Sequence, residues 1–237
     1  MSEGRALDSS AQDIRLLRAL TEQLKLPLIQ IARMAEFAKE SNDGSGLASI
    51  GNIADMALGL LDAFLLSADL RSQQTFPLEP VSLSSVLNDT AHKLSFIATQ
   101  NDCDLRLSIE GKYGPVMAHR ESLEYAMTLL GYGLISARSN GSSQHKVVLT
   151  AYKNTNGIVA GVFDNQPGLS ADTFRRGHAL FGATRQTMPS LIGGNGASIF
   201  VADTLMRAME APLRTVRHNT LSGFAATLNP SAQLVLL

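Results

Sequence analysis

The sequence has 237 residues, 45% of them hydrophobic, and a formal net charge of −1 at pH 7. This composition supports a packed core, and it excludes both a disordered chain and the basic surface of a nucleic-acid-binding protein. The single Cys103 excludes an intramolecular disulfide and a cysteine-based zinc site, and no run of about 18 apolar residues is long enough to cross a membrane.

Two long helices are predicted first. Residues 8–41 have apolar side chains at steps of three and four, which is the period of an amphipathic helix: Ile14, Leu17, Leu20, Leu24, Leu28, Ile31, Met34 or Ala35, and Ala38. Five helix breakers, Asn-Asp-Gly-Ser-Gly, follow at residues 42–46. A second helix is expected over residues 47–72, with one apolar face made by Ile50, Ile53, Ala57, Leu60 or Leu61, Phe64 and Ala68. Together they predict an antiparallel helical hairpin.

The apolar stripes of this hairpin need a further partner, because two amphipathic helices do not bury their stripes completely against each other. A symmetric dimer would meet this need, since two hairpins can form a four-helix bundle. The alternative is that the stripes pack only against the C-terminal half of the same chain. The predicted domains are a helical hairpin dimerisation domain at 8–73, a linker with two prolines at 74–80, and a second domain at 81–230.

The C-terminal half alternates helices and antiparallel strands. Residues 104–110 alternate strictly between apolar and polar, and the turn Asn-Thr-Asn-Gly at 154–157 predicts a hairpin. The expected helices cover 81–100 (capped by Ser82 or Ser84), 121–138, 171–181 and 198–211. The expected strands cover 104–110, 116–118, 146–152, 158–164, 213–216 and 223–228. A Gly/Ser/Thr-rich loop occupies 182–197. This order predicts an α+β sandwich with helices on one face of a mixed sheet.

Residues 21–28, Thr-Glu-Gln-Leu-Lys-Leu-Pro-Leu, place a proline inside a helical pattern, where it removes a backbone donor and kinks the helix. The segment resembles the H-box of sensor histidine kinases, Ser-His-Glu-Leu-Arg-Thr-Pro-Leu, whose histidine is phosphorylated. Glu22 stands in the place of that histidine, and Gln23 in the place of the acid. The resemblance implies a bundle surface on which regulators dock, around Glu22, Lys25 and Pro27.

The order of elements after the linker is similar to that of the ATP-binding domain of histidine kinases, gyrase and Hsp90-type ATPases. In that family an Asn-Leu-Leu-x-Asn-Ala motif holds magnesium, and residues 129–134, Leu-Leu-Gly-Tyr-Gly-Leu, resemble it. We place the magnesium-binding asparagine at Gly133, which has no oxygen ligand to offer, so we expect no metal. Gly133 is equally explained as a close-packing position on a helix.

A second motif follows at Asp164-Asn-Gln-Pro-Gly168, which resembles the family's Asp-x-Gly-x-Gly. The family's aspartate accepts a hydrogen bond from the adenine amino group, and Asp164 and Gly168 keep two of the three positions. Gln166 replaces the first glycine and adds volume where a nucleotide would lie. The alternative is that Asp164 is a turn or cap residue.

A glycine-rich segment, Gly193-Gly194-Asn-Gly196-Ala-Ser, resembles the family's Gly-Gly-Thr-Gly-Leu-Gly and leads into a helix. Exposed amides at a helix N-terminus bind phosphate well. The resemblance to this motif implies that the chain binds ATP or ADP, although only weakly. The alternative is a lid remnant without a ligand.

Histidine autophosphorylation requires an imidazole on the bundle, with an acid as general base. The sequence has five histidines, none within residues 1–91: His92, His119, His145, His178 and His218. The sequence therefore predicts a catalytically inactive histidine-kinase-like adaptor. It would be cytoplasmic and homodimeric, and would dock a response regulator receiver domain or a histidine kinase. The alternatives are a nucleotide-binding protein or ATPase of the same superfamily, a histidine-phosphotransferase-like protein (against which the missing histidine also argues), and a heterodimer partner of an active kinase.

Overall fold

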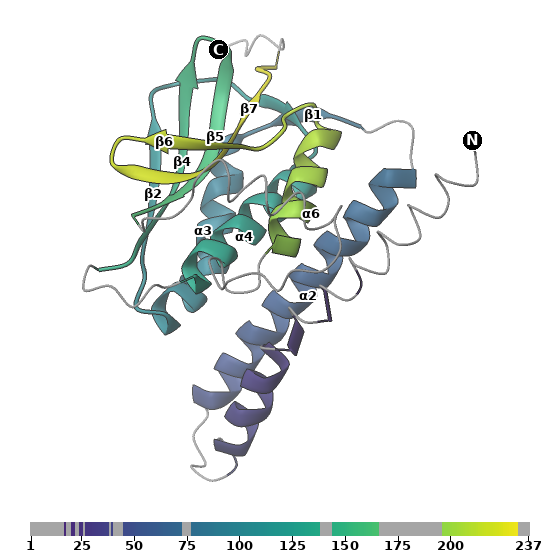
Figure 1. Ribbon diagram of the computed structural model, residues 1–237, viewed down its shortest axis with the longest axis vertical. Coiled ribbons are helices and arrows are strands. Elements are labelled where there is room, and N and C mark those ends of the chain that lie inside the picture. Colours follow the sequence, from purple (N-terminus) through teal and green to yellow (C-terminus); the bar gives the residue numbers. More distant parts are fainter. Residues whose placement is uncertain are drawn as a thin grey trace, which may run out of the picture.

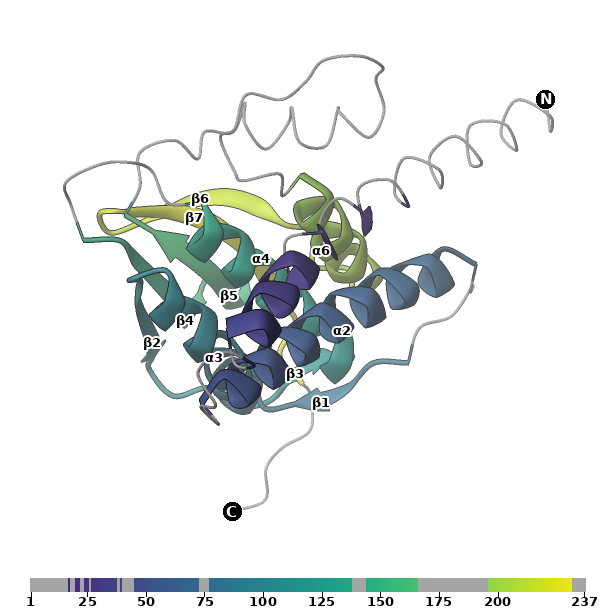
Figure 2. The same ribbon diagram turned by 90° about the horizontal axis from the view of Figure 1, so that it is seen from below.

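The computed structural model describes residues 17, 20, 21, 24, 25, 27–37, 39, 45–72, 77–137, 144–165 and 196–231. Within them, one five-stranded sheet is covered on one face by helices, and a long helix lies outside these (Figures 1 and 2). In the described part of the chain, no helix is both long and apolar enough to cross a membrane. The predicted helix at 171–181 and the loop up to residue 195 lie outside the described residues.

The sheet is mixed, as predicted. Its strand order is β2-β4-β5-β7-β6, with β2 parallel to β4 and every other pair antiparallel. The strands are β2 (Asp104–Glu110), β4 (Lys146–Asn154), β5 (Gly157–Asp164), β6 (Arg214–His218) and β7 (Leu221–Leu228). The predicted hairpin between β4 and β5 is confirmed, because Asn154 pairs with Gly157. Gly157 has a φ of +149°, a conformation that favours glycine.

A second, two-stranded sheet pairs β1 (Glu79–Val81) with β3 (Val116–Ala118). Residues 79 and 80, the last two of the predicted linker, thus form a strand with residues of the second domain. The strand tolerates Pro80 because a two-stranded sheet consists only of edges, where one missing N–H donor costs little. The buried Val81 and Val116 pair across it and fix the start of the C-terminal half on the core.

Three helices cover one face of the five-stranded sheet: α3 (Leu83–Gln100), α4 (Arg120–Ser136) and α6 (Gly196–Ala208). The predicted cap of α3 is Ser82, whose hydroxyl accepts a hydrogen bond from the Ser85 amide at 3.4 Å. The side chain of His119 caps α4 by accepting from the Ser122 amide. Helix α6 begins at Gly196, two residues earlier than predicted, and ends at Ala208 rather than at Ala211.

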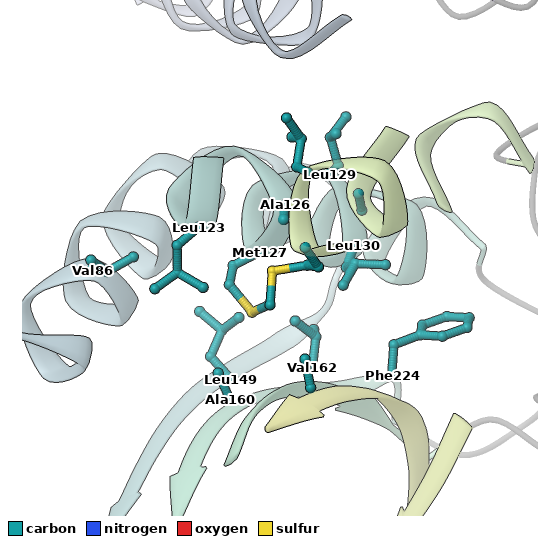
Figure 3. Close-up of a cluster of buried hydrophobic side chains, with 14 of the residues drawn as sticks. Val86, Leu123, Ala126, Met127, Leu129, Leu130, Leu149, Ala160, Val162 and Phe224 are labelled. Atoms are coloured by element: carbon teal, nitrogen blue, oxygen red, sulfur yellow. The ribbon is translucent and has the colours of Figure 1, made fainter. Parts of the chain in front are cut away.

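The core lies between α4 and the sheet. Figure 3 shows Leu123, Met127 and Leu130 of α4 pointing toward Leu149 and Val162 of the sheet. All five side chains are 0–2% exposed. The strand alternation therefore turns Leu149 and Val162 toward the helices, as the period of two predicts.

The long helix α2 (Ser45–Ser72) packs against α4 and α6. Its buried residues recur at helical spacing: Ile53, Ala57, Leu60, Ala63, Phe64 and Ser67. Of the predicted stripe, Ile50 and Leu61 are half-buried and Ala68 is exposed. The buried part of this stripe therefore packs against the C-terminal half of the chain. The described residues between 17 and 39 are helical and run beside α2 in both views (Figures 1 and 2).

Candidate functional site

Asp164 is the best-placed candidate. It is the last residue of β5, where it pairs with Val147 of β4 and Ser222 of β7. The helix-side core contains Ile158, Ala160 and Val162, so the alternation along β5 turns Asp164 toward the helices. Its side chain is 3% exposed. A buried carboxylate thus sits at the end of a strand, on the face that α4 and α6 cover.

Asn165 fixes the backbone beside this carboxylate. Its Oδ1 accepts from the Lys146 amide at 2.9 Å, and its Nδ2 donates to the Gln144 carbonyl at 2.7 Å. The Asn165 amide also donates to the Lys146 carbonyl at 3.2 Å. Sequence reasoning missed this role. The only signal was the residue type, since asparagine readily bonds to nearby backbone.

Cys103 lies at the same end of the sheet as Asp164, directly before β2, which pairs with β4. Burial raises the pKa of its thiol to about 11, and the negative charges of Asp104 and Asp164 raise it further, while a backbone hydrogen bond from Val147 lowers it. The thiol is therefore neutral at neutral pH. Cys103 contributes a small, half-buried apolar group near Asp164.

The magnesium motif on α4 also aligns on its Leu-Leu pair. The pattern Asn-Leu-Leu-x-Asn-Ala matches its Leu-Leu pair to Leu129 and Leu130 only when Thr128 and Tyr132 take the asparagine positions. In this alignment the second asparagine position is Tyr132, one residue before Gly133. Neither threonine nor tyrosine offers the carboxamide of the family's motif. The Tyr132 side chain is 5% exposed, and burial raises the pKa of its phenol.

The glycines of α4 are buried inside the helix layer. A Cβ on Gly131 would lie 2.3 Å from Cδ1 of Leu94, so this glycine lets α4 approach α3 closely. Gly133 is also buried. Within the described residues, no group of three or more His, Cys, Asp or Glu side chains could hold a metal ion.

Gly196 is the first residue of α6, which packs alongside α4. The amides of a helix's first turn have no partner within the helix and favour anions. Gly168, Gly193 and Gly194 lie outside the described residues, so only Asp164 and Gly196 of the predicted nucleotide set are placed. The Asp164 side chain faces the helix-covered side of the sheet, and α6, which begins at Gly196, lies on that side.

A buried carboxylate that sequence reasoning missed lies further along α6. Asp203 is 1% exposed, accepts from the Leu213 amide at 2.9 Å and pairs with Arg207 one turn later. Its two oxygens tie the end of α6 to the segment that leads into β6. Asp203 is thus a structural residue that fixes the position of α6.

The N-terminal motif is described in part. Lys25 and Leu28 are exposed, whereas Pro27 is buried although it lies in a helical stretch. Glu22 and Gln23 lie outside the described residues. In the motif that resembles the H-box, the buried Pro27 therefore lies between the exposed Lys25 and Leu28.

No protein-family model matches the sequence, and no curated protein matches it. Several solved structures share its fold. The Acinetobacter baumannii histidine kinase AdeS is 14% identical with a TM-score of 0.55, over 88% of this chain and 98% of that chain. The catalytic domain of the histidine kinase ThkA is 11% identical with a TM-score of 0.52, over 65% of this chain and 97% of that chain.

Full-length ShkA, solved in complex with AMPPNP, is 18% identical with a TM-score of 0.56, over 92% of this chain and 46% of that chain. At these identities the likeness concerns the fold. The chain shares the fold of these histidine kinase domains, in which a mixed five-stranded sheet is covered by helices on one face.

Proposed function

We propose that the chain is a catalytically inactive, histidine-kinase-like adaptor of two-component signalling. The observation that carries the proposal is the combination of a histidine-kinase fold with an N-terminal sequence, residues 1–91, that contains no histidine. Glu22 cannot form a phosphohistidine, and Gln23 cannot act as a general base. The fold is kept while the acceptor is absent.

The histidines that the structure describes occupy other places. His92 is exposed on α3, and His119 caps α4. His145 is buried directly before β4, and His218 stacks on Tyr152 with ring centroids 4.6 Å apart. None of these four lies on α2 or on the helical residues before it, so none can replace the missing acceptor.

The docking surface is the exposed side of the two N-terminal helices. Among the described residues, the large apolar side chains that are at least 45% exposed all lie there: Leu17, Leu28, Ile29, Phe37, Leu47, Leu58 and Leu65. Exposed apolar side chains that gather on one part of a molecule are typical of an interaction site. A second copy of the chain would cover it in a four-helix bundle formed by the hairpins of residues 8–73. A receiver domain or a kinase would dock around Glu22, Lys25 and Pro27.

Incubation with labelled ATP tests the missing chemistry. The purified chain should incorporate no acid-labile phosphate, with an active histidine kinase as the positive control. Label that is lost on acid treatment would contradict the proposal. Addition of an active kinase and a receiver domain to the same assay then shows whether the chain changes the phosphate flow between them.

A second candidate function, nucleotide binding without autophosphorylation, is favoured by the buried carboxylate of Asp164 on the helix-covered face. Titration with ATP in a calorimeter, with and without Mg²⁺, tests it. Micromolar binding that Asp164→Asn abolishes would favour this function. An unchanged affinity in Asp164→Asn would separate the binding from this residue.

A further inference from the structure

We propose that α2 is a fixed part of the ATPase-like core rather than a helix of a free-standing bundle. Helix α2 and the core therefore move as one body. This inference concerns the buried face of α2. It is independent of the proposed adaptor function, which uses the exposed face.

Helix α4 is buried on every side. Seven consecutive residues, from Leu129 to Ile135, are buried on this helix. Consecutive residues point in all directions around a helix, and a helix that is buried all round needs neighbours on every side. The sheet covers one side of α4, and α3 and α6 pack beside it. The side opposite the sheet is covered by α2 (Figure 2).

Leu129 shows this directly. In Figure 3 its side chain points away from the sheet, opposite to Leu130, yet it is only 1% exposed. Leu60, Ala63 and Phe64 of α2 belong to the same hydrophobic cluster as Leu129. Without α2, this side of α4 would expose apolar surface to water.

The two faces of α2 differ sharply in exposure. Phe64 is 3% exposed, while the next residue, Leu65, is 63% exposed. A polar contact accompanies the apolar one. The Asp62 carboxylate accepts a hydrogen bond from the hydroxyl of Tyr125 on α4, and burial together with Asp62 raises the pKa of that hydroxyl. Apolar burial and a cross-helix hydrogen bond thus hold α2 to α4 at the same level.

The consequence concerns α6, which also packs against α2 and whose first residue is Gly196. A partner that binds the exposed face of α2 contacts a helix whose opposite face holds α6. The start of α6 therefore cannot move far from α2 without opening the shared core. A partner that binds the exposed face of α2 therefore binds one rigid unit, which contains both α2 and the core with α6.

The experiment cuts the chain between the N-terminal helices, which end with α2, and the domain that begins at β1. A protease site inserted at residues 73–76 of the full chain, between α2 and β1, is cleaved under native conditions. The two fragments should elute together in size-exclusion chromatography at micromolar concentration and melt in one transition. Fragments that elute separately, with the N-terminal piece as its own oligomer, would overturn the proposal.

Two adjacent substitutions in the cleavable chain separate the buried face from the exposed face. Phe64→Ala should let the cleaved fragments separate, and Leu65→Ala should leave them together. Co-elution of the Phe64→Ala fragments with an unchanged melting temperature would also contradict the proposal. Hydrogen exchange on the uncleaved Phe64→Ala chain provides a second readout, because the amides of α4 and α6 should lose protection at least tenfold, whereas those of β2 should not.

Discussion

At the scale of single residues, glycines decide how closely the strands and helices of this chain approach one another. A Cβ on Gly223 of β7 would lie 2.1 Å from the Val162 carbonyl oxygen and 2.6 Å from the Phe163 Cα. Both are backbone atoms, which cannot rotate away. A Cβ on Gly161 would lie 2.5 Å from the Phe163 ring. These glycines make room for Phe163 on the face of the sheet opposite the helices.

Gly223→Ala should therefore destabilise the protein by about 1–3 kcal/mol, since overpacking against backbone forces the strands apart. Gly51→Ala is the matched control, because nothing lies within 4 Å of a Cβ at that exposed position in α2. It should stabilise the protein by about 0.5–1 kcal/mol through helix propensity. Urea unfolding measures both changes, and equal effects at the two glycines would refute the packing argument.

Cys103 provides a residue-scale prediction of pH dependence. Its pKa rises from 9.0 to about 11 in the folded protein, mainly because burial disfavours the thiolate. A raised pKa means that the folded state holds the proton more tightly than the unfolded state does. The stabilisation is therefore fully present below about pH 9 and is lost as the pH rises toward about 11.

Urea midpoints of the wild type and Cys103→Ala, measured from pH 8 to pH 11, check this prediction. The stability difference between them should shift against the wild type across that range. Alkylation by iodoacetamide at pH 8 should also be at least on the order of tenfold slower in the native protein than in urea, because the thiolate is the reactive form. Equal alkylation rates would show that the thiol is not protected.

At the scale of elements, the β6–β7 hairpin is held on the open face of the sheet by His218. The ring of His218 stacks on Tyr152 of β4 at an interplanar angle of 16°, and its centroid lies 5.6 Å from that of Phe163. Its Nε2 lies 3.2 Å from a carboxylate oxygen of Glu110 on β2. The end of one edge strand thus reaches the other edge strand across the face opposite the helices (Figure 1).

His218→Ala should destabilise the protein by about 1 kcal/mol, because a stacked pair contributes roughly 0.5–1.5 kcal/mol. The amides of β6 should lose hydrogen-exchange protection more than those of β4. Glu110→Gln should change stability by less than about 0.5 kcal/mol, since the Glu110 side chain is 48% exposed and exposed ion pairs contribute little. A larger effect of Glu110→Gln than of His218→Ala would assign the contact to charge instead of stacking.

At the scale of the whole molecule, the described residues form three layers: the sheet, then α3, α4 and α6, then α2 with the helical residues before it. The inner face of the third layer joins the core, and its outer face exposes Leu58 and Leu65. The proposed dimer and the proposed rigid unit therefore use different faces of one helix. Adjacent residues can test them separately.

Leu58→Asp with Leu65→Asp should convert the proposed homodimer to a monomer, because the charges would have to be buried in the four-helix bundle. The melting temperature of the monomer fold should change little, as both side chains are more than half exposed in the single chain. Light scattering combined with size exclusion measures the mass. A wild-type chain that is already monomeric at high micromolar concentration would refute the dimer.

The sequence by itself determined the elements whose signals are local. Three predictions that depend only on residues close in sequence are confirmed: the strand at 104–110, the turn at 154–157 and the helix cap at Ser82. The candidate site is only partly of this kind. Asp164 at a strand end followed from the pattern. The bonds of Asn165 to Gln144 and Lys146 did not, because they join residues about 20 positions apart.

The tertiary structure alone decided how the elements meet. The parallel pairing of β2 with β4, the packing of α2 on α4 and α6, and the contact of His218 with Glu110 join segments distant in sequence. An apolar stripe shows that a helix must be buried, but many surfaces can satisfy it. Hydrophobic burial has no direction, so only the assembled core selects the partner.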